Sequence, residues 1–242
     1  MAVITFPITL AQSFMISPKV KHFIFNCDLS PVFKFIPGQF ITIHFERDGK
    51  TIRRSYSLAN EPNSNNTIEF AVGYAEGGPG TELLFNLNPG DQIQINGPFG
   101  RLILKDEIPK RYIFAATSTG ITPFRAMLSQ LSQRLEQNPR LQVVILLGVQ
   151  KKEDLLYGDE FMVFATAHPQ VLFKPCFSQE HELQVGEYRG YIQQTFPDLH
   201  LNPEQDIVYL CGNPGMIDEA FTDLKNRDFA TQHVIREKYI SN

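Results

Sequence analysis

The chain of 242 residues contains no tryptophan and only three cysteines, which are Cys27, Cys176 and Cys211. The cysteines lie far apart and form no CxxC pair. This pattern excludes a Cys-ligated iron–sulfur cluster within the chain and disfavours a disulfide framework. It predicts a reduced, cytoplasmic setting. Positive charge is also scarce, because 22 Lys and Arg stand against 26 Asp and Glu for a net charge of −4. A general nucleic-acid binder is therefore not expected.

Long apolar runs are missing as well. No stretch reaches the ~18 apolar residues that a membrane span needs. The first fourteen residues have neither a basic start nor a small-residue cleavage site, so no secretion signal is expected. Apolar residues make up 43% and charged residues 20% of the sequence, as is typical of globular proteins. The length fits one large domain or two of ordinary size.

What the sequence does contain is two regions of different character. The first hundred residues hold short runs rich in Phe, Ile, Val and Thr, several of them alternating, with Pro, Gly and Asn between them. This pattern predicts an antiparallel β-barrel. The predicted strands are Val3–Leu10, Val20–Cys27, Gln39–Phe45, Ile52–Leu58, Thr67–Tyr74 and Gln92–Ile95.

Beyond residue 106, nearly continuous apolar strands alternate with amphipathic helices, which predicts a doubly wound parallel sheet. The domains are therefore expected at 1–106 and 107–242. The predicted strands are Tyr112–Thr117, Gln142–Leu147, Val171–Cys176, Ile207–Cys211 and His233–Glu237. The predicted helices are Pro123–Gln137, Asp154–Ala167, Ile192–Phe196 and Pro214–Asp228.

The run Arg53-Arg54-Ser55-Tyr56-Ser57 carries the first candidate site. In a strand, Arg54 and Tyr56 point the same way, about 7 Å apart. A guanidinium suits a phosphate and a flat ring suits another flat ring, while Ser57 follows at the strand end. The other interpretation is an ordinary barrel strand with an exposed Arg and a half-buried Tyr.

This run resembles the Arg-x-Tyr-Ser flavin signature of the ferredoxin–NADP reductase superfamily. The resemblance implies that Arg54 holds the FAD pyrophosphate and that Tyr56 stacks on the isoalloxazine ring. It further implies that Ser57 contacts the reactive N5 edge, and Ser55 is included in the same FAD site.

A glycine-rich turn, Glu76-Gly77-Gly78-Pro79-Gly80-Thr81, precedes a short apolar helical run. Backbone N–H groups at such a helix start favour a phosphate, and Thr81 is expected to cap the helix or to bind the anion. With Arg54, Gly80 and Thr81 would complete a pyrophosphate clamp. The other interpretation is an ordinary loop with a capped helix.

Three further segments resemble the same superfamily, in the same order. The turn Thr117–Phe124 resembles its Gly-x-Gly-x-x-Pro nicotinamide-nucleotide turn, with Ser118 in place of the first glycine. The segment after Tyr209 resembles its Cys-Gly-x-x-x-Met element, whose Cys lies against nicotinamide C4. The last nine residues resemble its Glu-x-Tyr ending, in which the aromatic ring covers the flavin. The nicotinamide-site residues that this implies are Thr119, Gly120, Ile121, Pro123, Cys211, Gly212 and Met216, with Glu237 near the carboxamide and Tyr239 at the flavin.

The resemblance implies an FAD-dependent NAD(P)H oxidoreductase that passes a hydride from nicotinamide to flavin N5. Ser57, Cys211, Glu237 and Tyr239 would be its catalytic residues. Single electrons would then pass to a ferredoxin or flavodoxin type acceptor. The alternatives are the reductase component of an oxygenase, a free-flavin reductase, or a redox-sensing protein without turnover. No metal site stands out.

The choice of nicotinamide cofactor depends on basic groups, because NADP needs them for its 2′-phosphate. Where NADP-using relatives commonly carry Arg, this sequence has Gln150, Gln179 and Tyr191. Lys151, Lys152 or Arg189 are the residues that would compensate. The sequence therefore favours NADH, or use of both cofactors.

Overall fold

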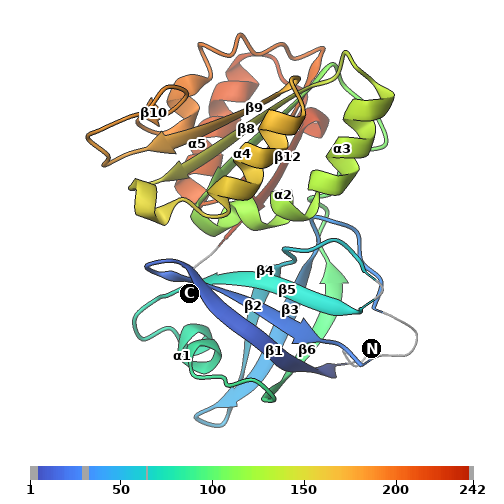
Figure 1. Ribbon diagram of the computed structural model, residues 1–242, viewed down its shortest axis with the longest axis vertical. Helices are drawn as coiled ribbons and strands as arrows, with labels where there is room; N and C mark the ends of the chain where they lie inside the picture. The colour runs from blue at the N-terminus through green and yellow to red at the C-terminus, as the bar shows by residue number, and fades with distance from the viewer. Residues whose placement is uncertain (1–4, 29–32, 64, 240–242) are drawn as a thin grey trace. The chain divides into compact units, whose positions relative to one another are not determined.

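The computed structural model describes residues 5–28, 33–63 and 65–239, which divide into two compact units (Figure 1). The first unit runs up to Leu104 and also includes Thr122–Met127. The second consists of Lys105–Ile121 and the chain from Leu128 onward. The apolar pattern did not indicate that Thr122–Met127 groups with the first unit.

The first unit is built on six antiparallel strands in the order β4-β3-β6-β1-β2-β5. A bridge between Leu58, directly after the outermost strand β4, and Phe70 of the other outermost strand, β5, closes the sheet into the predicted barrel. The strands are β1 (Phe6–Ser17), β2 (Val20–Asn26), β3 (Phe40–Arg47), β4 (Lys50–Ser57), β5 (Thr67–Gly73) and β6 (Gln92–Phe99).

Two barrel strands extend well beyond their predicted ends. Strand β1 continues to Ser17, well past Leu10, and residues 3 and 4 of the predicted strand lie outside the described residues. Strand β6, predicted to end at Ile95, continues to Phe99. In both cases pairing with neighbouring strands extends the element beyond its apolar run.

Phenylalanine dominates the interior of the barrel. The ring of Phe70 stacks on those of Phe23 and Phe25, with centroids 5.6 and 5.4 Å apart. All three side chains are fully buried, and each such burial contributes about 1.5–3 kcal/mol. One short helix, α1 (Pro79–Phe85), packs onto this core through Leu84.

The second unit contains a parallel sheet in the order β10-β9-β8-β7-β11-β12. Its strands are β7 (Arg111–Thr117), β8 (Gln142–Val149), β9 (Val171–Phe177), β10 (Tyr188–Arg189), β11 (Asp206–Gly212) and β12 (Val234–Lys238). Its α-helices are α3 (Leu128–Gln137), α4 (Gly158–Ala167) and α5 (Pro214–Asn226), while α2 (Thr122–Ala126) groups with the first unit. Four short 3₁₀ turns are η1 (Ser118–Ile121), η2 (Lys152–Asp154), η3 (Ile192–Thr195) and η4 (Thr231–His233).

Helices cover both faces of this sheet, as a doubly wound fold requires. Figure 1 shows α3 and α4 on one side of the sheet and α5 on the other. On the first side, Phe161 of α4 stacks on Phe173 of β9 at 5.4 Å. On the second side, Ile217 of α5 is buried in one cluster with Ile113 of β7. The predicted order of barrel and α/β sheet is confirmed.

The helix predictions were too long or of the wrong type. The predicted helix Pro123–Gln137 is two helices, α2 and α3, which are interrupted at Met127. The helix expected from Asp154 begins at Gly158, and Ile192–Phe196 is a 3₁₀ turn. The apolar pattern alone does not show where the i→i−4 bonding is broken. Within the described ranges, every helix falls short of the length and apolarity that crossing a membrane requires.

Candidate functional site

Strand β4 presents the first candidate site of the barrel. Alternation along the strand leaves Arg54 and Tyr56 half-buried on one face and Ser55 exposed on the other. The Arg54 guanidinium donates to the carbonyl oxygen of Arg53 at 2.8 Å. The predicted pairing of a guanidinium and a ring on one face is therefore present.

The Tyr56 ring packs against the core of the barrel. Its ring stacks on Phe70 with centroids 5.3 Å apart and an interplanar angle of 18°. Burial raises the pKa of Tyr56 to about 12, against the opposing effect of the Arg54 charge. The hydroxyl is therefore neutral at physiological pH, and the ring is a rigid aromatic surface.

Gly80 brings the start of α1 against these two side chains. A Cβ atom at Gly80 would lie 2.8 Å from the Tyr56 hydroxyl oxygen and 2.9 Å from Arg54 Cγ. Only glycine permits this approach. The first N–H groups of a helix have no intrahelical acceptor. Those of α1 lie beside the aliphatic part of the Arg54 side chain, because Gly80 approaches it this closely. This arrangement fits an anionic ligand that also carries a flat ring.

The other side chains of the predicted FAD site, those of Ser55, Ser57 and Thr81, have surroundings unlike those of Arg54 and Tyr56. The Ser55 hydroxyl lies 3.0 Å from Thr42 Oγ1 on the face away from Tyr56, so only the backbone of Ser55 is available on the Tyr56 face. Ser57 ends β4 and is buried. Thr81 does not cap α1, because Gly78 is the N-cap residue and the cap has no side-chain hydrogen bond.

In the second unit, the ends of β7 and β11 meet through two glycines. A Cβ atom at Gly120 would lie 2.3 Å from the Cys211 carbonyl oxygen, and one at Gly212 would lie 2.4 Å from Thr117 Oγ1. Gly212 also has a φ of +120°, in the region that favours glycine. The two predicted nicotinamide segments are therefore neighbours at the carboxyl edge of the sheet, where nucleotides bind in such folds.

The residues around Gly120 show how this turn is built. Ser118 has a φ of +48°, so the serine that replaces the expected glycine keeps a left-handed backbone. Ile121 and Pro123 are buried, while Thr119 is half-buried. Thr122, at the start of α2, is buried, and its hydroxyl has no hydrogen-bond partner among the described residues. A buried donor of this kind fits a polar group of a bound ligand.

Cys211, Glu237 and Tyr239 come together at the end of β11. Cys211 pairs with Glu237 across the parallel strands, and the Tyr239 amide donates to the Gly212 carbonyl oxygen at 2.8 Å. Burial and the Glu237 charge raise the pKa of the Cys211 thiol well above its usual value, against hydrogen bonds from Tyr239 and Gly212. Cys211 is therefore a neutral thiol and not a nucleophile.

Asn213, which the sequence pattern did not single out, positions Met216 and the start of α5. Met216 packs into the core under α5, and its amide donates to the side chain of Asn213. Asn213 caps α5, and its own amide donates to Thr117 Oγ1 at 2.8 Å. The signal was available, since Asn before Pro is a common helix start.

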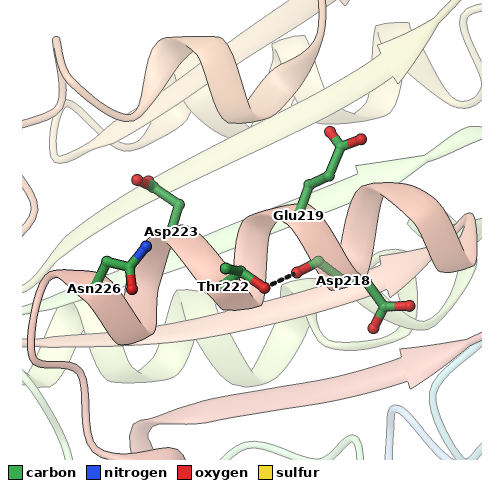
Figure 2. Close-up of a pocket in the computed structure, with 5 residues that line it drawn as sticks. All are labelled: Asp218, Glu219, Thr222, Asp223 and Asn226. Carbon is green, nitrogen blue, oxygen red and sulfur yellow. Dashed lines mark hydrogen bonds between the residues drawn. The ribbon is translucent and has the colours of Figure 1, made fainter.

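A shallow hollow on the exposed side of α5 is a separate feature (Figure 2). Its lining is mainly acidic, but the charges have partners: Asp218 binds Lys238 at 2.6 Å, and Asp223 binds Arg227 at 2.9 Å. Glu219 accepts from the Gln193 amide at 2.5 Å. The hollow is therefore a hydrogen-bonded surface and not the candidate site.

Comparisons with known proteins agree with this geometry. The oxidoreductase FAD-binding domain matches residues 7–103, and the oxidoreductase NAD-binding domain matches residues 114–221. These two domains define a flavin- and nicotinamide-dependent oxidoreductase. The sequence is 31% identical over 208 residues to ferredoxin–NADP reductase B of Sorangium cellulosum, covering 84% of both chains.

One further protein and one solved structure are also similar to this chain. The chain is 26% identical to the phenol 2-monooxygenase reductase component of a Pseudomonas species, covering 88% of this chain and 63% of that protein. The structure of a Neisseria gonorrhoeae ferredoxin NADP+ reductase with bound FAD and NADP has the same fold, with a TM-score of 0.84 at 23% identity. That match covers 97% of this chain and 98% of the other. The chain belongs to the ferredoxin–NADP reductase superfamily. It is an FAD-dependent NAD(P)H oxidoreductase.

Proposed function

We propose that this enzyme passes electrons from NAD(P)H, through FAD, to a separate ferredoxin or flavodoxin. The observation that carries the proposal is the match to ferredoxin–NADP reductase B over 84% of both chains. The cysteine pattern supports an external acceptor, because it leaves no set of ligands for an iron–sulfur cluster within the chain. All three cysteine side chains are buried, and their wide spacing in the sequence disfavours disulfides, which also supports a cytoplasmic setting.

Each candidate residue has a role that its surroundings permit. Arg54, with the first amides of α1, holds the FAD pyrophosphate, and charge-assisted bonds of this kind contribute about 1.5–3 kcal/mol. Tyr56, backed by Phe70, holds the flavin ring in place, and Ser57 donates at its N5 edge. When bound, FAD supplies the step between two-electron and one-electron chemistry.

In the second unit, the turn containing Thr119, Gly120 and Ile121 takes the nucleotide, together with Pro123 and the segment from Gly212 to Met216. Cys211, as a neutral thiol, gives a tight apolar contact to the nicotinamide without reacting with it. The resemblance of the last residues to the superfamily's Glu-x-Tyr ending supports the remaining roles, in which Glu237 would contact the carboxamide group and Tyr239 would cover the flavin face and gate access to it.

The experiment is anaerobic stopped-flow reduction of the purified yellow protein by NADH and by NADPH. Cytochrome c reduction is then measured with and without added ferredoxin. We expect rapid bleaching and a rate that ferredoxin increases many-fold. Ser57→Ala should slow bleaching about tenfold or more while its FAD content stays near that of the parent. Equal bleaching of the two proteins would contradict the role of Ser57.

A second candidate function is the reductase component of an oxygenase, favoured by the similarity to the phenol 2-monooxygenase reductase. A protein that bleaches normally but whose turnover does not respond to ferredoxin or flavodoxin would favour this candidate. Turnover that depends instead on added free flavin would indicate a free-flavin reductase.

A further inference from the structure

The carboxyl ends of β8 and β9 hold a group of charged residues with no role in the chemistry above. In a doubly wound sheet, the adenosine ribose of a dinucleotide lies beyond the strand that follows the glycine turn. Here that strand is β8, which pairs with β7 on one side and β9 on the other. The amide of Gln179 donates to the carbonyl oxygen of Gln150 at 2.9 Å, so the segments 150–154 and 178–189 lie together.

These two segments are negative overall. They contain three Lys and Arg and five Asp and Glu, for a formal charge of −2. A 2′-phosphate brings about 1.5 to 2 further negative charges at pH 7. A 2′-hydroxyl brings none, and a carboxylate is a suitable acceptor for it.

The nearby cations are engaged within the protein or surrounded by acids. Lys152 Nζ lies 3.1 Å from Glu187 Oε2, and the guanidinium of Arg189 donates to the His181 carbonyl oxygen. Lys151 is exposed, and its backbone amide donates to the carboxylate of Asp154, which places that acid beside it. Lys152 and Arg189 are therefore engaged within the protein, and Lys151 is left as an exposed cation among five acidic residues.

Glu180 is held as a fixed anion between the segments. Its carboxylate accepts from the Lys152 amide at 3.2 Å and from the His181 amide at 3.0 Å. These backbone hydrogen bonds lower the pKa of Glu180, so it is charged at neutral pH.

We infer that this edge of the sheet selects NADH over NADPH, and that Glu180 and Glu187 determine the choice. Glu180 repels a 2′-phosphate, and Glu187 forms an ion pair with Lys152, the lysine that would otherwise bind the phosphate. The inference rests on the proposed function. It assigns this chain a different cofactor from the one in the names of the ferredoxin–NADP reductases it resembles.

The first experiment measures both turnover and binding in the FAD-loaded enzyme. Values of kcat/KM for NADH and NADPH are obtained with ferricyanide as acceptor. Dissociation constants for NAD+ and NADP+ are obtained by calorimetry. We expect at least a tenfold preference for NADH and for NAD+. An equal or greater efficiency with NADPH would overturn the inference and leave the proposed function intact, whereas failure of both nucleotides to bind would overturn both.

Three variants test the residues. Glu187→Gln keeps an acceptor for the Gln184 amide but releases Lys152, and Glu180→Gln removes the fixed anion. Gln179→Arg adds a cation at an exposed position that contributes only its backbone to the sheet end. Each should raise the NADPH to NADH efficiency ratio about tenfold.

The matched control is Glu204→Gln. Glu204 is exposed and precedes β11 at the amino edge of the sheet. The control variant therefore changes the net charge by the same amount as Glu187→Gln or Glu180→Gln, but at the opposite edge of the sheet. Its ratio should equal that of the parent. If Glu187→Gln and Glu180→Gln move the ratio no more than this control does, their assignment is wrong.

Discussion

Ser118 is exposed, and its backbone has a φ of +48° although the residue is not glycine. A left-handed conformation costs a residue with a Cβ atom about 1–2 kcal/mol. Glycine, which the resembled Gly-x-Gly-x-x-Pro turn has at this position, adopts such a conformation without that cost.

We expect Ser118→Gly to raise the free energy of unfolding by about 0.5–1 kcal/mol, after allowing for the greater freedom of glycine in the unfolded chain. Urea denaturation measures the change. Ser178→Gly is the matched control, because Ser178 has no positive φ and glycine there should lower stability by a similar amount. A loss of stability in both variants would contradict the strain at Ser118.

At the scale of single elements, the approach of α1 to β4 depends on Gly80. A side chain at this position meets Tyr56 and Arg54 at less than 3 Å, so Gly80→Val should push α1 away from the strand. We expect FAD to bind at least tenfold more weakly, because the helix start and the guanidinium are separated. Fluorescence titration of the apoprotein with FAD measures this.

The control for Gly80→Val is Gly73→Ala at the end of β5. A Cβ atom at Gly73 would meet nothing within 4 Å, and the residue has no positive φ. Its affinity for FAD should stay within a factor of two or so of the parent. Equal affinities in both variants would show that the contact of α1 with β4 is not needed.

Helix α2 is attached to the barrel by a charged group that sequence patterns did not reveal. Arg125 Nη1 lies 3.2 Å from Glu69 Oε2 and donates to the Ala59 carbonyl oxygen at 2.9 Å. His22 Nε2 lies 3.3 Å from the same carboxylate oxygen of Glu69. Burial opposes the effect, but the His22 hydrogen bond and the Arg125 charge hold the pKa of Glu69 below its ordinary value.

A carboxyl group whose pKa is lowered by folding stabilises the protein above its unfolded-state pKa of about 4.3. This stabilisation is lost as the pH falls through the lower folded-state value. We expect Arg125→Met to cost about 1.5–3 kcal/mol at pH 7 and much less near pH 3. Urea denaturation at the two pH values measures this difference. Arg227→Met, which breaks an exposed i, i+4 pair with Asp223, should cost under about 0.5 kcal/mol at pH 7.

At the scale of the whole molecule, two domains take two different ligands, FAD by residues 7–103 and NAD(P) by residues 114–221. Ligand at 100 times its dissociation constant stabilises a folded protein by about 2.7 kcal/mol. We expect Arg54→Ala to lose most of the stabilisation by FAD and to keep that by NAD+. Thermal denaturation with each ligand measures both effects, and a loss of both would show that Arg54 supports the fold in general.

The sequence predicted the barrel, the α/β sheet and the order of the motifs, because alternation, apolar runs and glycine or proline turns are local signals. It placed Arg54 and Tyr56 on one face for the same reason. It failed at the split of α2 from α3, and of the two roles expected for Thr81 the structure contradicts the helix cap. Both depend on backbone bonding that the side-chain pattern does not record.

What the sequence determined by itself was therefore the set of elements and the residue types available at their ends. The tertiary structure alone decided that Gly80 meets Tyr56, that Glu187 engages Lys152, and that Arg125 reaches Glu69. In the order given, these contacts join residues that lie 24, 35 and 56 positions apart in the chain. Such distances are set by the packing of whole elements, which no local pattern encodes.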